Sequence, residues 1–389
     1  MAPDDQPRHS CAAFDLTDEQ HAYQSWVREV AASTLAPLAV RGEPGRVNRA
    51  LVAALGELGL LARLFPGVGE QSPSRSAAAL DLCLLREALA TVSTEAETAL
   101  ALQGLGTYPV LQSGSDEQVR RWVTAVARGE AVAGFALSEP DAGSDAAALA
   151  LAAEPDGDGW RLSGEKTWIS NAPEADFYSV FARTTPAAGA RGVTAFVVPG
   201  DAPGLSGEHL EMLSPHPIGR LIFDAVLVSR EDLLGQPDEG FGVAMRTLDL
   251  FRPSVGAFAV GMASAALDAA VSHAGERQAF GGPLRELQSV GHTLAEMATR
   301  LDAARLMVYR AGAAYDAGRP DVSTTSAMAK LAATEMAQYV VDAAIQIHGA
   351  RALQRGHLLE HLYREVRAPR IYEGASEVQR SIIARDLYR

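Results

Sequence analysis

The sequence predicts an α+β protein whose elements follow the order helices, strands, helices. From Phe14 to about Arg128, apolar residues recur at helical spacing and are interrupted by Pro and Gly. Between about Gly134 and Gly235, short apolar or β-branched runs alternate with Gly, Pro and Asp, as in strands joined by turns. From Phe241 onward, long helical patterns return. Strands and helices do not alternate along the chain, so a doubly wound dinucleotide-binding fold is not expected.

Length and charge narrow the classes of partner. A chain of 389 residues corresponds to two or three domains of ordinary size. The 34 Lys and Arg residues against 48 Asp and Glu residues give a net charge of −14, which repels the phosphates of nucleic acids and anionic membranes. The longest uninterrupted apolar run, around Ala146 to Ala153, is far shorter than the roughly 20 residues of a membrane span. We therefore expect no nucleic-acid partner and no membrane span.

The N-terminus and the cysteine content bear on cellular location. The N-terminal stretch MAPDDQPRHSCAAFD carries acidic residues where a secretory signal has a basic and then an apolar region, so we expect a short flexible lead-in. Cys11 and Cys83 are the two cysteines, which are too few for a disulfide framework or a Cys-based metal site. A reducing cytoplasm fits this composition best.

We predict three domains, covering 1–133, 134–236 and 237–389. The helical stripes expected in the first domain contain Leu51, Leu55, Leu58, Leu80, Leu84, Leu85 and Leu89. The strands expected in the second domain include Phe177–Ala182, Val193–Val198 and Leu221–Val228. The two stripes expected in the third domain contain Val290, Leu294, Met297, Leu301 and Val308, and Met328, Leu331, Met336, Tyr339, Ala343 and Ile347. Ser376 and Gln379 have the spacing of a capping box, which predicts the start of a last short helix.

Two motifs that suggest nucleotide or metal binding have plainer structural explanations. Gly104-x-Gly106 lacks a third glycine and follows no predicted strand, so we interpret Gly104 as part of an ordinary turn. His357 and His361 lie one helical turn apart with Glu360 between them, as metal ligands do, but no third ligand has an evident position. A solvated, charged helix face is the favoured interpretation, and we expect no metal site.

Two segments at the start of the strand region could share one ligand. Phe135–Asp145 combines a hydroxyl, a Glu-Pro turn, a Gly-Ser pair and an acid. In Gly164–Asn171, Trp168 and Ser170 lie two residues apart on an expected strand and so share one face. A flat ligand that contacts both segments is one interpretation, and a structural Trp in the core of a sheet is the other.

Three charged residues each allow a functional and a structural interpretation. Arg277, at the end of a long helical pattern, could bind phosphate or serve the helix macrodipole. Arg252 could contact a phosphate or be a surface charge. Glu373 stands before a glycine turn and beside the apolar residues Ile371 and Tyr372, so its pKa could be raised for general-base catalysis. It could equally complement the positive end of the following helix dipole, and spacing alone leaves both possibilities open.

Taken together, these motifs resemble the acyl-CoA dehydrogenase family over essentially the whole chain, from Phe14 to Arg389. The resemblance implies an N-terminal helical domain, a middle β-barrel-like domain and a C-terminal four-helix bundle. Four separated motifs agree with the family in identity, order and distance: Leu-Ser-Glu-Pro-Asp-Ala-Gly-Ser-Asp145, Gly164-Glu-Lys-Thr-Trp-Ile-Ser-Asn171, Arg277-Gln-Ala-Phe-Gly-x-Pro with Gln288, and Ile371-Tyr-Glu-Gly with Ser-Glu-x-Gln-Arg380.

The resemblance implies that FAD binds between the β-domain and the C-terminal bundle. The positions that would line its isoalloxazine ring are Phe135, Leu137, Ser138, Trp168 and Ser170. The positions that would hold the ADP portion of an FAD bound mainly by a neighbouring subunit are Arg277, Phe280, Gln288, Gln346 and Gly349, and Glu377 is a further cofactor position. At least a homodimer is therefore implied, and a homotetramer is usual for the family.

The resemblance also implies a reaction. Glu373 matches the catalytic base, which removes the α-proton of an acyl-CoA while the β-hydrogen passes as hydride to flavin N5, leaving a trans-2-enoyl thioester. The thioester carbonyl is hydrogen-bonded by a flavin hydroxyl and by the backbone N–H of the base. An external acceptor such as an electron-transfer flavoprotein then receives the electrons. The positions that match acyl-CoA contacts are Ser144, Asp249, Arg252, Tyr372 and Gly374.

Three positions distinguish this chain from other members. Some members place the base just before the arginine that matches Arg252, but here that residue is Phe251, which cannot accept a proton. The assignment of the base to Glu373 is thereby favoured. Ala375 replaces the threonine that follows Glu-Gly in the family, and Gly349-Ala-Arg-Ala352 replaces its Gly-Gly-x-Gly, so we expect altered FAD affinity.

Two alternatives remain. With the same fold and base, the substrate could be an acyl group on a carrier protein, or the enzyme could be an oxidase that reacts directly with oxygen. The chain could also be a catalytically silent flavoprotein scaffold. The presence of Glu373, Ser138, Trp168 and Arg277 together argues against a silent scaffold.

Overall fold

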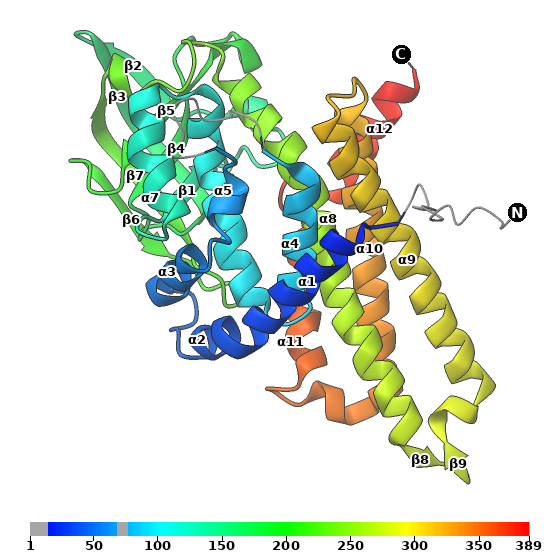
Figure 1. The fold of residues 1–389 in the computed structure, drawn as a ribbon. Helices are drawn as coiled ribbons and strands as arrows, with labels where there is room; N and C mark the ends of the chain where they lie inside the picture. Colours follow the sequence, from blue (N-terminus) through cyan, green and yellow to red (C-terminus); the bar gives the residue numbers. More distant parts are fainter. Residues whose placement is uncertain (1–14, 68–76, 389) are drawn as a thin grey trace, which may run out of the picture.

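A computed structural model describes residues 15–67 and 77–388 of the chain. The predicted lead-in and Cys11 lie outside these residues. The predicted order of helices, strands and helices is confirmed, with the sheet on one side of the molecule and the long C-terminal helices on the other (Figure 1).

The N-terminal part is helical. Its helices are α1 (Asp18–Val30), α2 (Ala36–Val40), α3 (Arg49–Glu57), α4 (Ala79–Ala90), α5 (Thr94–Ser113), α6 (Asp116–Gln118) and α7 (Thr124–Ala127). A capping box starts α1, since the Thr17 hydroxyl accepts from the Gln20 N–H at 3.2 Å and the Gln20 side chain accepts from the Thr17 N–H at 3.0 Å. Five of the seven predicted leucines are buried, and Leu58 and Leu80 are half-buried.

The interpretation of Gly104 as part of a turn is wrong. Gly104 and Gly106 both lie inside α5, where the chain comes very close to two neighbours. A Cβ atom on Gly104 would lie 2.9 Å from the Phe251 ring, and one on Gly106 would lie 2.8 Å from the Ala133 backbone. These glycines allow α5 to pack tightly against the long helix that carries Phe251 and against the first strand.

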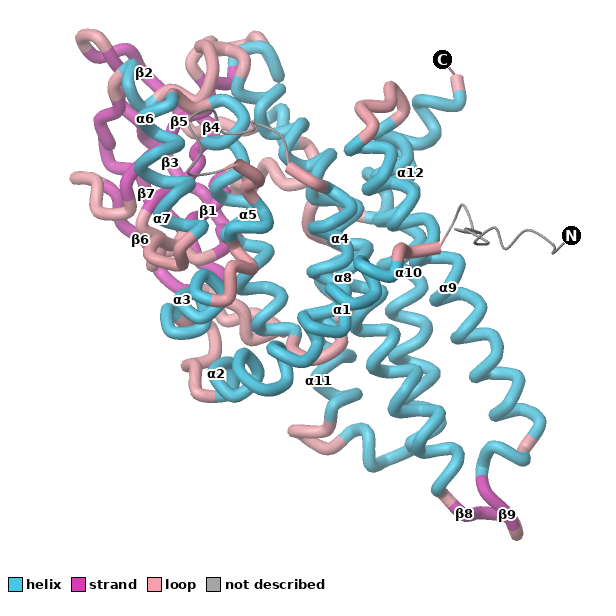
Figure 2. The backbone as a smooth tube through the Cα atoms, in the orientation of Figure 1, coloured by secondary structure: helices cyan, strands magenta, loops and turns pink. Residues whose placement is uncertain are grey.

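The middle part is one curled sheet. Its strands are β1 (Ala133–Ala136), β2 (Ala152–Asp156), β3 (Gly159–Ser170), β4 (Phe177–Arg183), β5 (Val193–Pro199), β6 (Leu205–His209) and β7 (Ile218–Val228). The strand order is β1-β4-β2-β3-β7-β6, with β5 paired to β4. All three predicted strands are therefore confirmed. Figure 2 shows the strands gathered in one layer, and α5 lies against β1 and β4.

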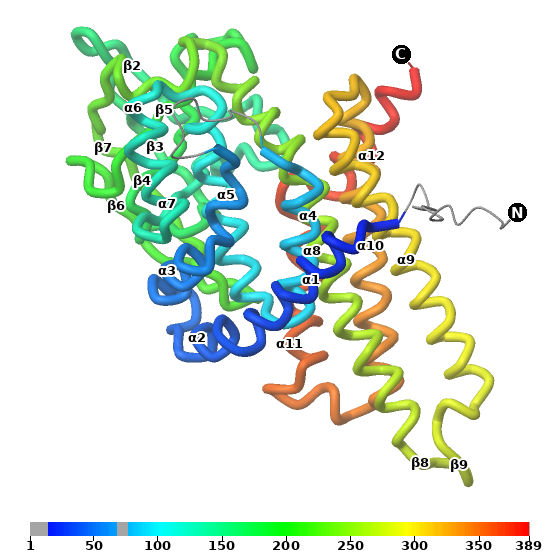
Figure 3. Tube along the Cα trace, viewed as in Figure 1, coloured from blue at the N-terminus to red at the C-terminus, as the bar shows by residue number. Residues whose placement is uncertain are grey.

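The C-terminal part is a bundle of long helices. Its elements are α8 (Gly240–Glu276), β8 (Gln278–Ala279), β9 (Gly282–Pro283), α9 (Gln288–Asp316), α10 (Val322–His348), α11 (Leu358–Glu365) and α12 (Ser376–Leu387). Helix α4 packs against both α8 and α9 and contributes Cys83 and Ala90 to the core of the bundle. In Figure 3, α4 and α5 lie between the sheet and the bundle, so the N-terminal helices connect the two.

Helix α8 is long and apolar enough to cross a membrane by length and composition, although no such span was expected from the sequence. The window that meets this test is 72% buried inside the protein. Helix α8 packs against α4, α9 and α10, and this burial is typical of a helix in the core of a domain.

The predicted stripe on α10 is partly confirmed, because Tyr339, Ala343 and Ile347 pack against the core of the bundle. Met336 is buried, but the other five predicted residues are only half-buried. The buried face consists mainly of small residues and also contains Lys330. The reason is the close approach of α8, because a Cβ atom on Gly256 of α8 would lie 3.3 Å from the Ala333 side chain. On α9, Met297, Leu301 and Val308 are buried as predicted, and Val290 and Leu294 are half-buried.

The predicted capping box at the start of α12 is also wrong, although the helix itself is confirmed. Ala375 is the N-cap residue, and no side chain caps the helix. The Ser376 hydroxyl instead donates to the Glu335 carboxylate on α10 at 2.6 Å. The Gln379 side chain donates to the carbonyl oxygens of Glu373 and Gly374 at 3.1 and 2.8 Å. A tertiary partner binds the Ser376 side chain and the preceding loop binds the Gln379 side chain, so neither caps the helix.

Candidate active site

The loop before α12 holds Glu373 in an unusual backbone conformation. Glu373 has a φ of 52° and Gly374 a φ of 92°, so two successive residues are left-handed. For a residue other than glycine this conformation costs about 1–3 kcal/mol and persists where neighbouring groups fix it. The Glu373 carbonyl oxygen accepts from Arg252 Nε at 3.3 Å and from the Gln379 amide at 3.1 Å. Groups from α8 and α12 thus hold this strained residue in place.

The carboxylate of Glu373 is available for chemistry. Its Oε2 atom is buried and has no hydrogen-bond partner among the described residues. Burial raises the pKa of Glu373, and the charges of Arg86, Lys330 and Arg252 oppose that rise. A buried carboxylate that lacks a hydrogen-bond partner and has a raised pKa is the arrangement expected of a general base.

Helix α8 brings Arg252 to this loop beside Pro253, where the helix lacks one of its backbone hydrogen bonds. Pro253 has no N–H, so the carbonyl oxygen of Asp249, four residues earlier, loses its helical partner. The hydroxyl of Ser326 on α10 donates to that oxygen at 3.0 Å. Arg252 is only 5% exposed and pairs with the Asp249 carboxylate at 2.9 Å. The interpretation of Arg252 as a surface charge is therefore wrong.

Phe251, next to Arg252, lies where some relatives of this sequence would place the base. Its side chain is buried, its ring faces Gly104, and its centroid lies 6.3 Å from that of Tyr108. The residue fills space between α5 and α8 and carries no proton acceptor. The position of Phe251 therefore agrees with the assignment of the base to Glu373.

A buried ion pair near Glu373 was missed in the sequence. Arg86 on α4 pairs with Glu97 on α5, and its guanidinium also donates to the Ser254 hydroxyl at 2.7 Å. Ser254 in turn donates to the Phe251 carbonyl at 2.7 Å, so the pair is bonded to the turn of α8 that carries Arg252. Among the charges that lower the Glu373 pKa, that of Arg86 has the largest effect. A charged residue inside the apolar run of α4 was the signal that could have revealed it.

The two segments expected to contact a flat ligand do lie together. The Thr167 N–H donates to the Ser138 carbonyl at 3.0 Å. Buried Lys166 donates to the Leu137 carbonyl at 2.9 Å and to the Glu139 carboxylate at 2.7 Å. These bonds join the loop after β1 to β3, and they place the predicted residues Leu137 and Ser138 beside the strand that carries Trp168 and Ser170.

Trp168 is turned out of the sheet. It lies at a register shift in β3, has a φ of 57° and is 51% exposed, so the interpretation as a structural Trp in the sheet core is wrong. No described hydrogen bond uses the hydroxyls of Ser138 and Ser170, which are half-buried. Phe135 is also half-buried and packs against Phe181 at a centroid distance of 5.0 Å. An exposed indole next to two free hydroxyls suits a flavin ring, which needs a flat apolar contact and hydrogen-bond donors.

The remaining predicted cofactor and substrate positions are spread over three places. Arg277, Phe280 and Gln288 are exposed where α8 ends and α9 begins, and Gln346 and Gly349 lie where α10 ends. These two regions meet, because His273 of α8 stacks on His348 of α10 at a centroid distance of 4.2 Å. Glu377 and Tyr372 are exposed near Glu373, and Ser144 is exposed in the loop after β1.

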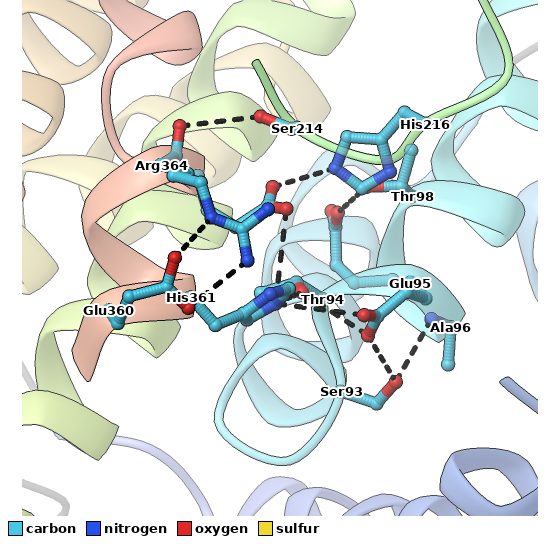
Figure 4. A network of polar contacts seen from close by, with 12 residues as sticks. Ser93, Thr94, Glu95, Ala96, Thr98, Ser214, His216, Glu360, His361 and Arg364 are labelled. Atoms are coloured by element: carbon cyan, nitrogen blue, oxygen red, sulfur yellow. Dashed lines mark hydrogen bonds and ion pairs between the residues drawn. The ribbon is translucent and has the colours of Figure 1, made fainter. Parts of the chain in front are cut away.

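The helix that carries His361 makes structural contacts (Figure 4). His361 Nε2 lies 2.6 Å from the Thr94 hydroxyl, and His357 caps α11 by accepting from the Leu359 N–H. Glu360 pairs with Arg364 on the same helix at 2.8 Å. The interpretation of this face as solvated is thus wrong for His361. Within the described ranges, no group of three or more His, Cys, Asp or Glu residues is placed to hold a metal ion.

The helical and sheet domains, the free carboxylate and the exposed indole define a flavin-dependent oxidoreductase. The chain belongs to the acyl-CoA dehydrogenase family. Residues 17–130, 134–226 and 238–388 match the models of its N-terminal, middle and C-terminal domains. Members of the family are FAD flavoproteins, and FAD is therefore the cofactor that Trp168 and the two serines suit.

Two relatives illustrate the similarity in sequence. The chain is 35% identical over 380 residues to the probable acyl-CoA dehydrogenase FadE25 of Mycobacterium tuberculosis, covering 97% of each chain. It is 38% identical over 385 residues to the mitochondrial short-chain specific acyl-CoA dehydrogenase of Mus musculus, covering 97% of this chain and 92% of the relative.

Three solved structures illustrate the similarity in fold. Butyryl-CoA dehydrogenase from Megasphaera elsdenii has a TM-score of 0.89 at 32% identity, over 96% of this chain and 99% of that one. A chain from a study of the electron transferring flavoprotein of Acidaminococcus fermentans has a TM-score of 0.90 at 34% identity, over 97% and 99%. The prolyl acyl carrier protein oxidase AnaB has a TM-score of 0.88 at 26% identity, over 96% and 100%.

Proposed function

We propose that this protein oxidises an acyl-CoA thioester to the trans-2-enoyl thioester, with Glu373 as the base that removes the α-proton. The observation that carries the proposal is the buried Oε2 atom of Glu373, which has no partner among the described residues and lies in a loop fixed on several sides. A structural carboxylate at this depth would be paired or hydrogen-bonded.

The backbone of the same loop supplies a second group for the reaction. None of the described hydrogen bonds uses the N–H of Glu373, so this donor is free to bind the thioester carbonyl oxygen. A hydrogen bond there stabilises the negative charge that develops as the α-proton leaves and lowers the pKa of that proton. Burial raises the pKa of Glu373, which brings the two pKa values closer together.

The middle domain would hold the cofactor. The Trp168 ring and the hydroxyls of Ser138 and Ser170 would bind the isoalloxazine ring of FAD. Bound FAD supplies the acceptor for the β-hydrogen, which no side chain of this chain could take as hydride.

Replacing the base tests the proposal. Glu373→Gln keeps the size of the side chain but cannot remove a proton, so we expect bound FAD to be retained and flavin bleaching by acyl-CoA to slow by about 10²–10⁴-fold. Glu296→Gln, on the exposed face of α9, is the matched control and should bleach at the wild-type rate. Anaerobic stopped-flow absorbance with straight, branched and aromatic acyl-CoA thioesters measures the rate of flavin bleaching in the wild type and in both variants. Wild-type bleaching in Glu373→Gln would rule out the assignment.

The similarity to AnaB supports a second candidate, an acyl-carrier-protein substrate or an oxidase reaction. A carrier-linked thioester lacks the adenine nucleotide, so an enzyme for it should reduce its flavin much faster with an acyl-carrier protein than with the same acyl group on CoA. Repeating the assay in air with the better substrate distinguishes an oxidase from a dehydrogenase, because an oxidase turns over with oxygen and a dehydrogenase needs another electron acceptor. We propose an electron-transfer flavoprotein as that acceptor.

We further propose that the protein is at least a homodimer and in full a homotetramer. Phe280 is 92% exposed, and with Arg277 and Gln346 it lies at the end of the bundle remote from Glu373. Lys330, which contacts the Glu373 loop, and His348 are 18 positions apart on α10, which corresponds to about 27 Å along the helix. These residues are thus poorly placed for the flavin of their own chain and are available to the ADP portion of a partner's FAD.

A further inference from the structure

Lys330 is a fully buried lysine without a salt bridge. Its side chain lies on α10 and is 0% exposed. Its Nζ atom donates to the carbonyl oxygen of Tyr372 at 2.9 Å and to that of Gly374 at 2.7 Å. No carboxylate in the described part of the chain lies within ion-pair distance of this atom. Burying an ammonium group without a carboxylate is costly, so such a residue is retained where its position serves a purpose.

The two bonds of Lys330 bracket the proposed base. Tyr372 and Gly374 are the residues before and after Glu373, and the carbonyl of Glu373 itself is bound by Arg252 and Gln379. Three consecutive carbonyl groups therefore have donors from α8, α10 and α12. Each peptide group is planar, so holding the Tyr372 carbonyl fixes the direction of the Glu373 N–H, and holding the Glu373 carbonyl as well fixes the direction of its Cα–Cβ bond.

We propose that Lys330 is a positioning residue for the base, and that its ammonium group holds the Glu373 carboxylate and backbone N–H in the geometry that the reaction needs. The proposal rests on the proposed role of Glu373. Misplacing a reacting group by about 1 Å can reduce a rate by about 10²-fold. Lys330 thus acts through Glu373 and touches neither substrate nor cofactor.

The charge of Lys330 acts on the same carboxylate. The charged groups that influence Lys330 are Glu373 in the loop, Arg252 on α8, Glu335 on α10 and Glu377 on α12. Burial lowers the pKa of Lys330 to about 8, and Glu373 is the strongest of the charges that oppose this change. Lys330 in turn lowers the pKa of Glu373. Removing the ammonium group should therefore raise the pKa of the base.

The test compares Lys330→Met and Lys330→Gln with a neighbouring control in the FAD-loaded enzyme. Lys330→Met removes both donors and the charge, so we expect kcat to fall by about 10²-fold with little change in KM. The acid limb of the kcat–pH profile should move to higher pH. Lys330→Gln restores a donor without the charge, so we expect it to recover part of the rate but to keep the shifted acid limb.

Thr334→Val is the control, because Thr334 lies one turn further along α10 and its buried hydroxyl bonds to carbonyls of its own helix. It should leave the rate and the pH profile unchanged. An unshifted acid limb in Lys330→Met, or an equal loss of rate in Thr334→Val, would overturn the proposal. If Lys330→Met does not fold, Lys330→Gln decides, and a wild-type acid limb there overturns it.

Failure of the proposed function gives a different result. In that case the wild-type flavin is not bleached by any thioester, or Glu373→Gln bleaches as the wild type does. Either result removes both proposals. If the wild type is bleached and Glu373→Gln is slow as expected, an unaffected Lys330→Met removes only the role of Lys330.

Discussion

Gly104 marks the place where α5 comes closest to the Phe251 ring of α8. A Cβ atom there would lie 2.9 Å from Phe251 Cζ and 3.3 Å from Leu64 Cδ1. Both neighbours are buried, so neither can move without disturbing the core around it. The absence of a side chain at Gly104 therefore allows α8, which carries Arg252, to pack closely against α5.

Gly104→Ala should destabilise the protein by about 1–3 kcal/mol, because the gain in helix propensity is smaller than the cost of overpacking. Urea unfolding followed by circular dichroism measures this. Gly291→Ala in α9 is the matched control, since its Cβ atom would meet nothing nearer than 4.0 Å. We expect that variant to be neutral or up to about 1 kcal/mol more stable. Equal stability of Gly104→Ala and the wild type would show that α8 can move away from α5.

At the scale of one element, α8 tolerates a proline because a neighbouring helix compensates for it. Pro253 removes the hydrogen bond to the Asp249 carbonyl, and Ser326 of α10 replaces it at 3.0 Å. Ser326 is fully buried, so water cannot take its place. This bond also connects α10, which carries Lys330, to the turn of α8 that carries Arg252.

Ser326→Ala should cost about 1–3 kcal/mol, because it leaves the Asp249 carbonyl without the donor that the buried Ser326 supplies. Thermal unfolding with and without bound FAD measures the loss. Ser272→Ala is the control at an exposed site of α8, where the hydroxyl bonds to Glu276, and it should change the stability by less than about 0.5 kcal/mol. Similar losses in the two variants would mean that the Asp249 carbonyl does not need Ser326.

At the scale of the whole molecule, one network joins the three parts of the chain (Figure 4). His216, in the loop before β7, lies 2.6 Å from the Glu365 carboxylate of α11. His361 lies 3.8 Å from Glu365 and 3.7 Å from Glu95 at the start of α5. Burial alone would lower the pKa of His216, but the charge of Glu365 raises it above its ordinary value. Burial alone would raise the pKa of Glu365, but the charge of His216 lowers it below its ordinary value.

This pair gives the stability of the protein a predictable pH dependence. Because the pKa of His216 is raised, its contribution to the stability of the folded protein is fully present below its ordinary pKa of 6.5. That contribution is lost as the pH rises through the pKa that His216 has in the folded protein. The lowered pKa of Glu365 means that its contribution is present above 4.5 and is lost as the pH falls below that value. The pair should therefore stabilise the protein most between these two values.

His216→Gln should lose about 1–3 kcal/mol near pH 6 and less near pH 9, because a smaller fraction of the wild-type imidazole is charged at the higher pH. Thermal melting of both proteins at the two pH values measures the difference. His209→Gln is the control, since His209 lies 3.9 Å from Glu174 and is partly exposed. A loss that does not change with pH would contradict a charged pair at His216.

The elements that the sequence predicted correctly are those with local signals. The strands β4, β5 and β7 stand out because their β-branched and apolar runs end at turn residues. The α10 stripe was only partly right, because close packing selected small residues for most of the buried face, and alanine gives little periodic signal. The capping box at Ser376 failed because Glu335, distant in sequence, binds the Ser376 hydroxyl, and the carbonyls of the preceding loop bind the Gln379 side chain.

The candidate site also contains some residues that local sequence patterns identified and others that only the tertiary structure revealed. Glu373, Trp168 and Ser138 belong to compact motifs, so the sequence alone determined their identity and the family that they indicate. Lys330, Arg86 and the turn at Pro253 belong to no motif, and only the tertiary structure brings them near the Glu373 loop. A compact motif can be read from neighbouring residues in the sequence. The backbone conformation and the pKa of Glu373 instead depend on charges and hydrogen-bond donors from helices that are distant in sequence, and linear spacing does not encode these.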